Sequence, residues 1–252
     1  MHVIGIIPAR YESVRFPGKL LAPIQGKSLI QRCYENGKRA PSLKDLVVAT
    51  DDERILSHIH TIGGEAVLTS PSCQNGTERL AEVVRNYPQY SYADIIVNIQ
   101  GDEPLVEPEA IEAIIFALKD NPKASMATAC IPLDPSEASD SSKVKVVLNL
   151  AGEALYFSRA LIPAGKSLSM QTTAPYYKHI GIYAYRKDFL LAYAKIPSTP
   201  LQLAEDLEQL KVLECGYTIQ VAIINSQSMG VDTPEDLIKV EKLIACKPNI
   251  SL

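Results

Sequence analysis

The basic residues Arg10, Arg15 and Lys19 follow the first apolar run of the chain, at residues 2–7. The Pro17-Gly18 pair predicts a turn that places Lys19 at the end of this loop. In α/β proteins, ligands commonly bind where a strand ends, and loop amides and cationic side chains there converge on an anion such as a phosphate chain. A solvated surface loop is the alternative interpretation of three nearby cations. Their position directly after the first predicted strand favours the anion site.

This loop lacks the two commonest phosphate-binding motifs. No G-x-G-x-x-G follows a predicted strand. Gly26-Lys27-Ser28 imitates only the tail of a Walker loop, since Leu21 stands where that motif requires glycine. A P-loop ATPase and a dinucleotide-dependent dehydrogenase are therefore disfavoured.

Two aspartates have the position expected of metal ligands. Asp102 follows the apolar stretch 94–100, and Asp232 follows a predicted strand and precedes a helix start. Carboxylates suit Mg²⁺, a hard ion that is usually held by one or two protein carboxylates plus substrate phosphates. Each aspartate also has an alternative role as a helix cap, Asp102 before Pro104 and Asp232 before Pro234.

A third polar segment, Gln74 to Arg79, is predicted to be a turn that leads into a helix, with Thr77 as the helix cap. Backbone amides at such a turn, together with Arg79, are suited to an anion or to the edge of a base. A plain Asn-Gly turn without a ligand is the alternative.

The elements that must position these residues alternate between strands and helices in the first half of the chain. Strands are predicted at residues 2–7, 45–50, 65–68, 94–100 and 124–130. Helices are predicted from Ser28 to about Arg39, from 53 to near 63–64, from Thr77 onward and from Pro108 onward. This alternation predicts an α/β fold with a doubly wound, mostly parallel sheet.

The second half is richer in predicted strands. They lie at residues 144–150, 154–159 and 179–186, with a polar loop at 163–177, and are followed by a helix at 201–215, a strand at 218–224 and a helix at 234–245. We interpret the β-rich part, at about residues 131–190, as an insertion within a single domain of residues 1–252. Such an insertion would cover the edge of the sheet or mediate the pairing of two chains.

Composition excludes several classes of protein. A net charge of −4 and a pI near 5.6 argue against a nucleic-acid partner, whose binding surface is basic. The sequence has no apolar stretch long enough for a membrane span and no signal-peptide pattern at its start. The cysteines are scattered, odd in number and without a C-x-x-C pair, which indicates reduced thiols and neither disulfides nor a zinc site. We therefore expect a soluble cytoplasmic protein.

With these segments in view, the chain resembles a family of nucleotidyltransferases, the 3-deoxy-manno-octulosonate cytidylyltransferases, also called CMP-KDO synthetases. The matching stretches, in order along nearly the whole chain, are Ile7–Tyr11 with Arg15 and Pro17–Lys19, Val48–Asp51, Gly76–Glu82, Val97–Pro104, Val144–Val147, Ala154–Arg159, His179–Tyr183, Leu207–Leu210 and Gly230–Asp236. The resemblance implies a nucleotide-diphospho-sugar transferase-like, Rossmann-like fold. It also implies a homodimer, with the β-rich insertion acting as a sugar lid and dimer contact.

The resemblance further implies an Mg²⁺-dependent enzyme. This enzyme would join CTP to 3-deoxy-D-manno-octulosonate, giving pyrophosphate and CMP-KDO for lipopolysaccharide synthesis. The catalytic residues would be Arg10, Arg15, Lys19 and Asp102, and the metal ligands Asp102 and Asp232. The nucleotide would be bound by Pro8, Ala9, Arg10, Arg15, Lys19, Gln74, Asn75, Gly76 and Arg79. The sugar would be bound by Gln100, Arg159, His179, Tyr183, Tyr185, Glu208 and Gln209.

Several of the sugar-binding candidates have structural alternatives. Tyr183 and Tyr185 alternate along a predicted strand and fit a half-buried core equally well. A lone histidine such as His179 is more often structural than functional. Glu208 and Gln209 are ordinary residues for an amphipathic helix.

Three rival functions remain open at this point. One is a related CMP-acidic-sugar synthetase, such as a CMP-sialic-acid-type enzyme. A second is a nucleotide-sugar-dependent glycosyltransferase, although Gly101-Asp102-Glu103 stands in place of its usual D-x-D. The third is a non-catalytic nucleotide-binding module, against which the joint presence of the basic loop and both aspartates argues.

Overall fold

The computed structural model describes residues 1–165, 174–226 and 229–246. Its internal contacts divide the chain into two compact units, Met1–Ile111 with Gln227–Leu252, and Glu112–Ser226. The chain passes from the first unit to the second within α4 (Pro108–Asp120). The second unit contains the expected β-rich insertion at about 131–190 and extends beyond it on both sides. Whether the chain acts as one domain stays a prediction.

The first unit is built on four parallel strands in the order β6-β1-β4-β5. These strands are β1 (Val3–Ala9), β4 (Asp45–Thr50), β5 (Ala66–Leu68) and β6 (Ile95–Asn98). Strand β1 lies between β4 and β6, and its residues Val3 to Ile7 are all buried. Parallel strands that are covered on both faces require such continuous apolar runs. The predicted doubly wound arrangement is confirmed here.

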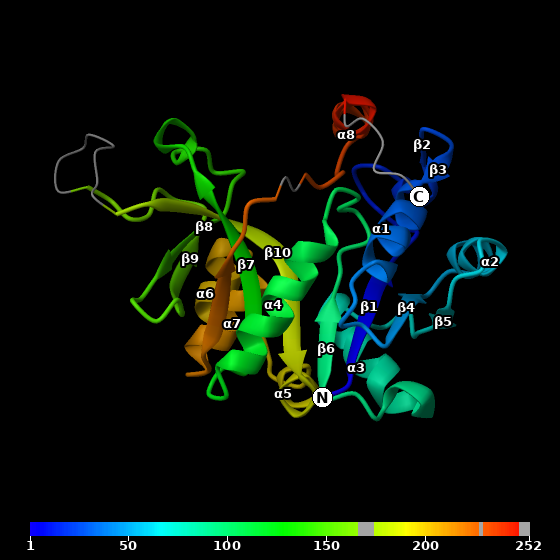
Figure 1. Ribbon diagram of the computed structural model, residues 1–252, viewed down its shortest axis with the longest axis horizontal. Helices are drawn as coiled ribbons and strands as arrows, with labels where there is room; N and C mark the ends of the chain where they lie inside the picture. The colour runs from blue at the N-terminus through cyan, green and yellow to red at the C-terminus, as the bar shows by residue number, and fades with distance from the viewer. Residues whose placement is uncertain (166–173, 227–228, 247–252) are drawn as a thin grey trace. The chain divides into compact units, whose positions relative to one another are not determined.

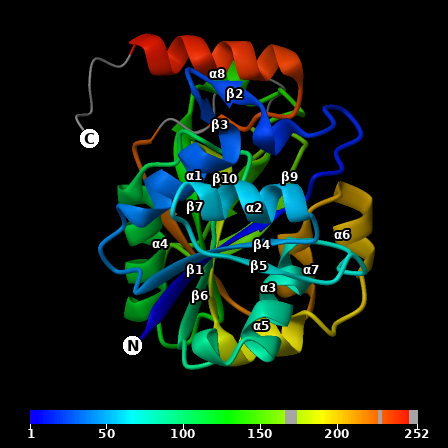
Figure 2. The same ribbon diagram turned by 90° about the vertical axis from the view of Figure 1, so that its right-hand side faces the viewer.

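Helices cover both faces of this sheet. Figure 2 shows α1 (Leu29–Lys38) and α2 (Glu53–Thr61) on one side of β1 and β4 and α3 (Gly76–Asn86) on the other. Ser28 and Asp52 cap the first two helices, as their side chains accept hydrogen bonds from the first-turn amides. The predicted cap of α3 was wrong by two residues. Asn75, not Thr77, accepts from the amide of Glu78 at 2.9 Å.

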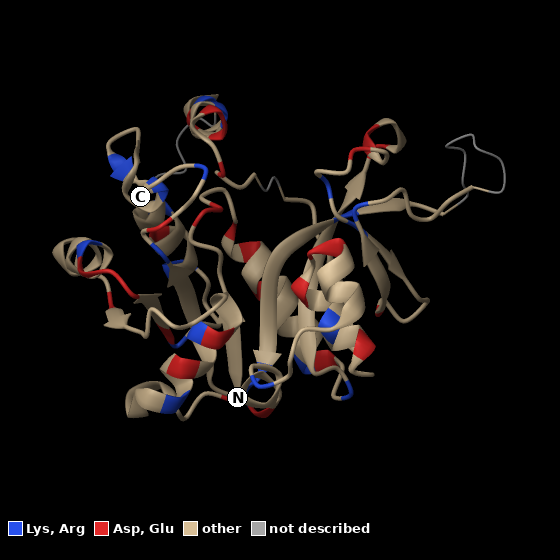
Figure 3. Ribbon diagram, turned by 180° about the vertical axis from the view of Figure 1, so that it is seen from behind, with Lys and Arg blue, Asp and Glu red and all other residues tan. Residues whose placement is uncertain are grey.

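Smaller elements complete the first unit. They are the 3-10 helices η1 (Lys19–Leu21) and η2 (Pro88–Tyr90), the hairpin strands β2 (Pro23–Ile24) and β3 (Lys27–Ser28), and the C-terminal helix α8 (Pro234–Cys246). Figure 3 shows that α8 carries both acidic and basic residues.

The second unit holds a mixed sheet, visible in Figure 1. Its elements are β7 (Met126–Leu133), η3 (Pro135–Glu137), β8 (Lys145–Leu148), β9 (Ala154–Ser158), β10 (Tyr176–Arg186), α5 (Lys187–Tyr193), α6 (Pro200–Glu205), α7 (Glu208–Glu214) and β11 (Ile219–Ile223). Strand β7 pairs in parallel with β11 and antiparallel with β10. Strands β8 and β9 form the predicted hairpin, and β10 meets β8 at Lys178 and Lys145.

In this unit one predicted helix is wrong and one observed helix was not predicted. The single helix expected at 201–215 is two helices, because Asp206 adopts a left-handed conformation with φ 53° that ends α6. Helix α5 was not predicted at all. Much of the predicted polar loop at 163–177, namely residues 166–173, lies outside the described residues, and β10 begins within its end at Tyr176.

All five cysteines are described and free, as the sequence analysis predicted. Burial raises the pKa of the Cys130 thiol to about 12, and burial with the neighbouring Glu82 raises that of Cys73 to about 11. Such thiols stay protonated and unreactive at neutral pH. Among the described helices, none has the length and apolarity needed to cross a bilayer.

Candidate active site

Lys19 is the centre of a cation–carboxylate cluster in the first unit. Its Nζ donates hydrogen bonds to Asp102 Oδ2 at 2.7 Å, to the carbonyl of Val231 at 2.9 Å and to Asp232 Oδ1 at 3.1 Å. Arg15 Nη2 lies 3.0 Å from the other oxygen of Asp232. The structure therefore brings together both predicted metal ligands and two of the three predicted phosphate-binding cations.

Local backbone features place these side chains. Gly18 has φ 69°, which glycine adopts without strain, and it begins the 3-10 turn that carries Lys19. A Cβ at Gly101 would lie only 3.2 Å from the carbonyl oxygen of Pro8, so glycine allows the loop after β6 to pack against the end of β1. The amide of Val231 donates to the carbonyl of Asp102 at 2.9 Å, which fixes the C-terminal segment beside that loop.

Neither aspartate acts as the helix cap that was left open above. The helix after Asp102 begins only at Pro108. At the start of α8, Asp236 accepts from the amide and hydroxyl of Thr233, and its own amide donates back to the Thr233 hydroxyl. This reciprocal pair performs the capping role and leaves the Asp232 carboxylate directed at Lys19 and Arg15.

The charge of Lys19 is reinforced by its surroundings. Burial acts to lower the pKa of Lys19, but the charges and hydrogen bonds of Asp102 and Asp232 outweigh it and raise the pKa above its ordinary value. The side chain is thus a permanent cation at neutral pH. It is well placed to neutralise a phosphate chain.

Arg10 and Lys19 both line a cavity of about 230 Å³. Pro8, Gln100 and Asp102 line the same cavity. The Nη2 atom of Arg10 is buried and has no hydrogen-bond partner among the residues that the structure describes. A buried cationic donor at a cavity is suited to an anionic ligand, because buried donors are normally satisfied.

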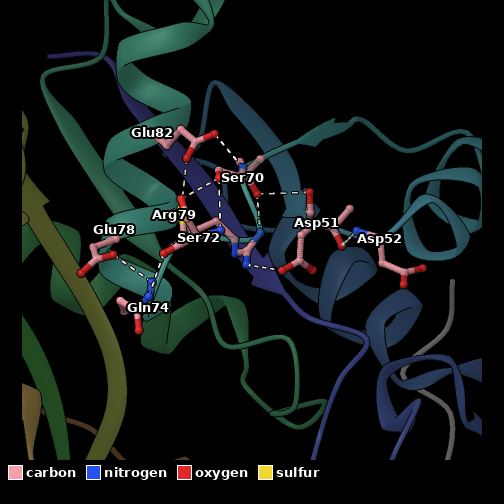
Figure 4. Close-up of polar contacts among 11 residues, drawn as sticks. Asp51, Asp52, Ser70, Ser72, Gln74, Glu78, Arg79 and Glu82 are labelled. Carbon is pink, nitrogen blue, oxygen red and sulfur yellow. Dashed lines mark hydrogen bonds and ion pairs between the residues drawn. The ribbon is translucent and has the colours of Figure 1, made fainter.

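The loop at residues 70–75 is braced by side chains of α3, as Figure 4 shows. Glu82 accepts from the amide of Ser70 at 2.8 Å and from Cys73 Sγ at 3.0 Å. Glu78 accepts from the amide of Gln74 at 2.8 Å. The loop conformation is therefore set by the first two turns of the following helix.

Arg79 is placed differently from its predicted role. Its side chain is fully buried and its Nη atoms donate to Asp51 Oδ2, at 2.8 Å, and to the hydroxyl of Thr69. Figure 4 shows it directed toward Asp51. Arg79 thus ties α3 to the ends of β4 and β5, and nucleotide binding by Gln74, Asn75 and Gly76 stays a prediction.

Gly76 connects this loop to the end of β1. A Cβ at Gly76 would lie 3.2 Å from Cγ of Pro8. The predicted nucleotide-binding residues Pro8 and Ala9 therefore lie beside the N-terminus of α3, where backbone amides point out of the helix. Within the first unit, the structure brings the two predicted nucleotide segments together.

In the second unit, Arg159 is anchored at the end of β9. Its amide donates to Glu205 Oε2 at 3.0 Å and its Nε to the carbonyl of Glu205 at 3.1 Å. In the described parts of the chain its Nη1 and Nη2 atoms make no hydrogen bond, and the side chain is half-buried. A fork of two free donors is suited to a carboxylate.

His179, Tyr183 and Tyr185 are all buried on β10, and the ring of Tyr183 lies 5.7 Å from that of His179 and 6.0 Å from that of Tyr185. His179 shares a hydrogen bond of 2.9 Å with Thr128, and burial with the nearby charge of Lys178 lowers its pKa to about 3, so it is neutral. Tyr183 donates to Gln209 Oε1 at 3.4 Å. The ring of Tyr185 stacks with Phe189, which makes it part of a buried aromatic cluster.

The remaining sugar-binding candidates are divided between the units. Glu208 and Gln209 begin α7, where the backbone carbonyl of Glu208 accepts from Tyr193. Gln100 lies in the first unit, on the cavity of Arg10 and Lys19. Glu205 is not among the predicted site residues, because the helix break beside it at Asp206 has no recognisable signal in the sequence. Lys145 is not among them either, although it lies in one of the matching stretches.

Comparison with known proteins identifies the family of the chain. A family model described as cytidylyltransferase matches residues 4–219. A 3-deoxy-manno-octulosonate cytidylyltransferase of Protochlamydia amoebophila is 55% identical over 251 residues, covering 99% of this chain and 96% of that protein. The enzyme of the same name from Chlamydia pneumoniae is 48% identical, covering 98% and 95%.

A solved structure is also similar throughout. It is the structure of CMP:2-keto-3-deoxy-manno-octonic acid synthetase complexed with CTP, with a TM-score of 0.91 and 40% identity, covering 97% of this chain and 99% of that one. On the family model, these near full-length relatives and this structure, the chain belongs to the 3-deoxy-manno-octulosonate cytidylyltransferase family.

Proposed function

We propose that this protein transfers the cytidylyl group of CTP to 3-deoxy-D-manno-octulosonate and releases pyrophosphate. Family membership and the CTP complex of the similar structure support the substrates. They favour this activity over a CMP-sialic-acid-type synthetase and over a glycosyltransferase. The observation that carries the proposal is the cavity in which Lys19, Asp102 and the unpartnered Nη2 of Arg10 meet.

The first unit binds and neutralises the triphosphate. Arg10 offers a buried donor to a phosphate oxygen, and Lys19 and Arg15 bring two further positive charges to the same region. In the transition state, negative charge grows on the α-phosphate and on the leaving pyrophosphate. Because fixed cations interact with this growing charge, they stabilise the transition state more than the ground state and so accelerate the transfer.

Asp102 and Asp232 are the residues that would hold Mg²⁺. Their carboxylates already converge on one cation, the ammonium of Lys19, so the donor set fits a hard divalent ion. The described residues contain no cluster of three or more metal-binding side chains, so substrate phosphates and water would complete the shell. Bound Mg²⁺ supplies charge neutralisation and orientation of the phosphates.

The second unit recognises the acceptor sugar. The free Nη fork of Arg159 suits its carboxylate, and Tyr183 with Gln209 offers neutral groups to its hydroxyls. The anomeric hydroxyl forms the new O–P bond as the bond to pyrophosphate breaks, and its proton passes to solvent. His179, with its pKa near 3, is neutral and acts as a hydrogen-bonding group, not as a charge.

The wider setting is part of the same proposal. We place the product in lipopolysaccharide synthesis. We place the enzyme in the cytoplasm, and the five free cysteines support this location. We also propose a homodimer formed through the β-rich part. The support is the exposure of Leu150 and Leu155 on the β8–β9 hairpin, apolar side chains that a second chain would cover.

One assay tests the proposal. Pyrophosphate release is measured with CTP, 3-deoxy-D-manno-octulosonate and Mg²⁺, and then with each component omitted or replaced. We expect release only when all three are present. Equal turnover with UTP, with a sialic acid or with a neutral hexose would refute the substrate assignment, and undiminished release in a metal chelator would refute the role of Mg²⁺.

A further inference from the structure

Arg159 is fixed by two residues to which no role has been assigned so far. The first is Glu205, the last residue of α6. Its Oε2 accepts from the amide of Arg159, its Oε1 accepts from the hydroxyl of Ser158 at 2.6 Å, and its backbone carbonyl accepts from Arg159 Nε. Glu205 thus fixes both the backbone amide and the Nε atom of Arg159.

The break between α6 and α7 makes the last of these contacts available. The final carbonyls of a helix have no partner inside the helix. Asp206, in its left-handed conformation, ends α6 immediately after Glu205. The carbonyl of Glu205 is therefore free to accept from Arg159 Nε instead of continuing a helical ladder.

The second residue is Lys145, on β8 beside Ser158 in the hairpin register. Its side chain is fully buried, and its Nζ donates to the carbonyls of Asp140 at 2.8 Å, Lys143 at 2.6 Å and Arg159 at 2.7 Å. An ammonium has three donors, and all of them are used here. A charge is rarely buried in this way without a specific role, because its desolvation is costly.

We propose that Glu205 and Lys145 are positioning residues for Arg159. Together they fix its amide, its carbonyl and its Nε, so that only the Nη fork remains to bind a carboxylate. The inference rests on the proposed function, in which that carboxylate belongs to the acceptor sugar. A fixed fork loses little conformational entropy on binding and discriminates a planar carboxylate from a neutral group.

Glu205→Gln is the main test, because it keeps the size of the side chain and replaces one accepting oxygen by a donor. If Glu205 positions Arg159, KM for the octulosonate should rise on the order of 10-fold, because a misdirected Arg159 guanidinium binds the sugar less well. KM for CTP should change less than about twofold. Lys145→Met keeps the length of the side chain and removes all three donors. We expect it to raise KM for the octulosonate and to leave KM for CTP nearly unchanged as well.

Arg159→Ala provides the background for a double-mutant cycle. If Glu205 acts through Arg159, then Glu205→Gln added to Arg159→Ala raises the sugar KM no further. The same result is expected when the parent enzyme and Glu205→Gln are compared on an octulosonate analogue with a carboxamide in place of the carboxylate. Additive effects in either comparison would overturn the proposal.

Arg186→Met is the matched control. Arg186 also donates to three backbone carbonyls in this unit, those of Leu118 and Ala124 at 2.8 Å and of Asn121 at 3.1 Å. We expect it to lower the melting temperature without a selective change in sugar KM. If Glu205→Gln behaves like Arg186→Met, its role is structural and the proposal is refuted.

The outcomes also separate this inference from the function on which it rests. If Arg159→Ala itself leaves the sugar KM unchanged, the carboxylate assignment fails. If Arg159→Ala raises the sugar KM and neither Glu205→Gln nor Lys145→Met does, only the positioning role of Glu205 and Lys145 fails. Should Lys145→Met not fold, Glu205→Gln decides alone, since Glu205 is only partly buried.

Discussion

Arg79 and Arg159 are both predicted ligand-binding residues, yet their surroundings differ. Arg79 is fully buried, and its Nη atoms are committed to Asp51 and Thr69. Arg159 is half-buried, its backbone and Nε are anchored, and none of the described residues bonds its Nη atoms. The guanidinium is the same in both places, so the neighbouring acceptors decide which arginine holds the fold and which one can hold a ligand.

The position of the paired carboxylate explains the difference. Asp51 reaches the end of the Arg79 fork, whereas Glu205 accepts from the amide of Arg159 through its carboxylate and from Nε through its carbonyl. An acidic neighbour is therefore not by itself a sign that an arginine is occupied. The atom that it contacts is the informative feature.

The largest expected effect is the loss of stability on Arg79→Met, because it leaves the Asp51 carboxylate without its buried partner. Breaking such a pair costs about 3–5 kcal/mol, which urea unfolding will measure. Asp51→Asn should act in the same direction. If Arg79→Met unfolds like the parent and instead raises KM for CTP, then Arg79 contacts the nucleotide and the comparison with Arg159 fails.

Lys19 is a third cation, committed to carboxylates as Arg79 is but facing the cavity. Lys19→Ala should leave the fold intact and lower kcat/KM on the order of 100-fold or more, as loss of a transition-state contact typically does. Steady-state kinetics and thermal melting together check this. Near-normal kcat/KM would show that its contacts are structural.

Asp102→Asn tests the carboxylate on the other side of the Lys19 contact. Asparagine keeps the size of the side chain but offers Mg²⁺ a weaker, neutral oxygen. We expect a melting temperature within a few degrees of the parent, loss of most turnover, and partial recovery at high Mg²⁺ or Mn²⁺. Normal turnover at low Mg²⁺ would rule out Asp102 as a metal ligand.

Arg159→Ala should raise KM for the octulosonate and leave KM for CTP nearly unchanged. Loss of a charged hydrogen bond costs about 1.5–3 kcal/mol, which corresponds to roughly 10- to 150-fold in binding. Melting should change far less than in Arg79→Met. A change confined to the CTP parameters would move Arg159 to the nucleotide site.

The smallest effect is expected for Asp52→Asn, the neighbour of Asp51. Asp52 caps α2 and pairs with the exposed Arg54. Asparagine is an equally good cap, and exposed ion pairs contribute about 0–1 kcal/mol, so unfolding should change by less than about 1 kcal/mol. A loss as large as that of Asp51→Asn would show that position in this loop matters more than the Arg79 contact.

Lys19, Asp102 and Asp232 are each predicted as site residues, in part because each follows a predicted strand of an α/β pattern. The direct contacts of Lys19 with both carboxylates are not predicted and come from the structure. The sequence does not reveal the direction of Arg79, since an arginine in the first turn of a helix can turn inward or outward at equal local cost. Nor does it predict the left-handed Asp206, a conformation that aspartate tolerates without any sequence signature. The sequence predicts Thr77 as the cap of α3, whereas the structure has Asn75 there, and both residue types serve as caps.

The hydrogen bonds from Lys19 to Val231 and Asp232 join residues 212 and 213 positions apart. During synthesis on a ribosome, the N-terminal loop therefore emerges long before its partners do. A nascent or prematurely terminated chain that stops before Val231 has one of the two acidic groups and none of the backbone contact that holds it. We therefore expect chains that stop before Val231 to be inactive rather than partly active.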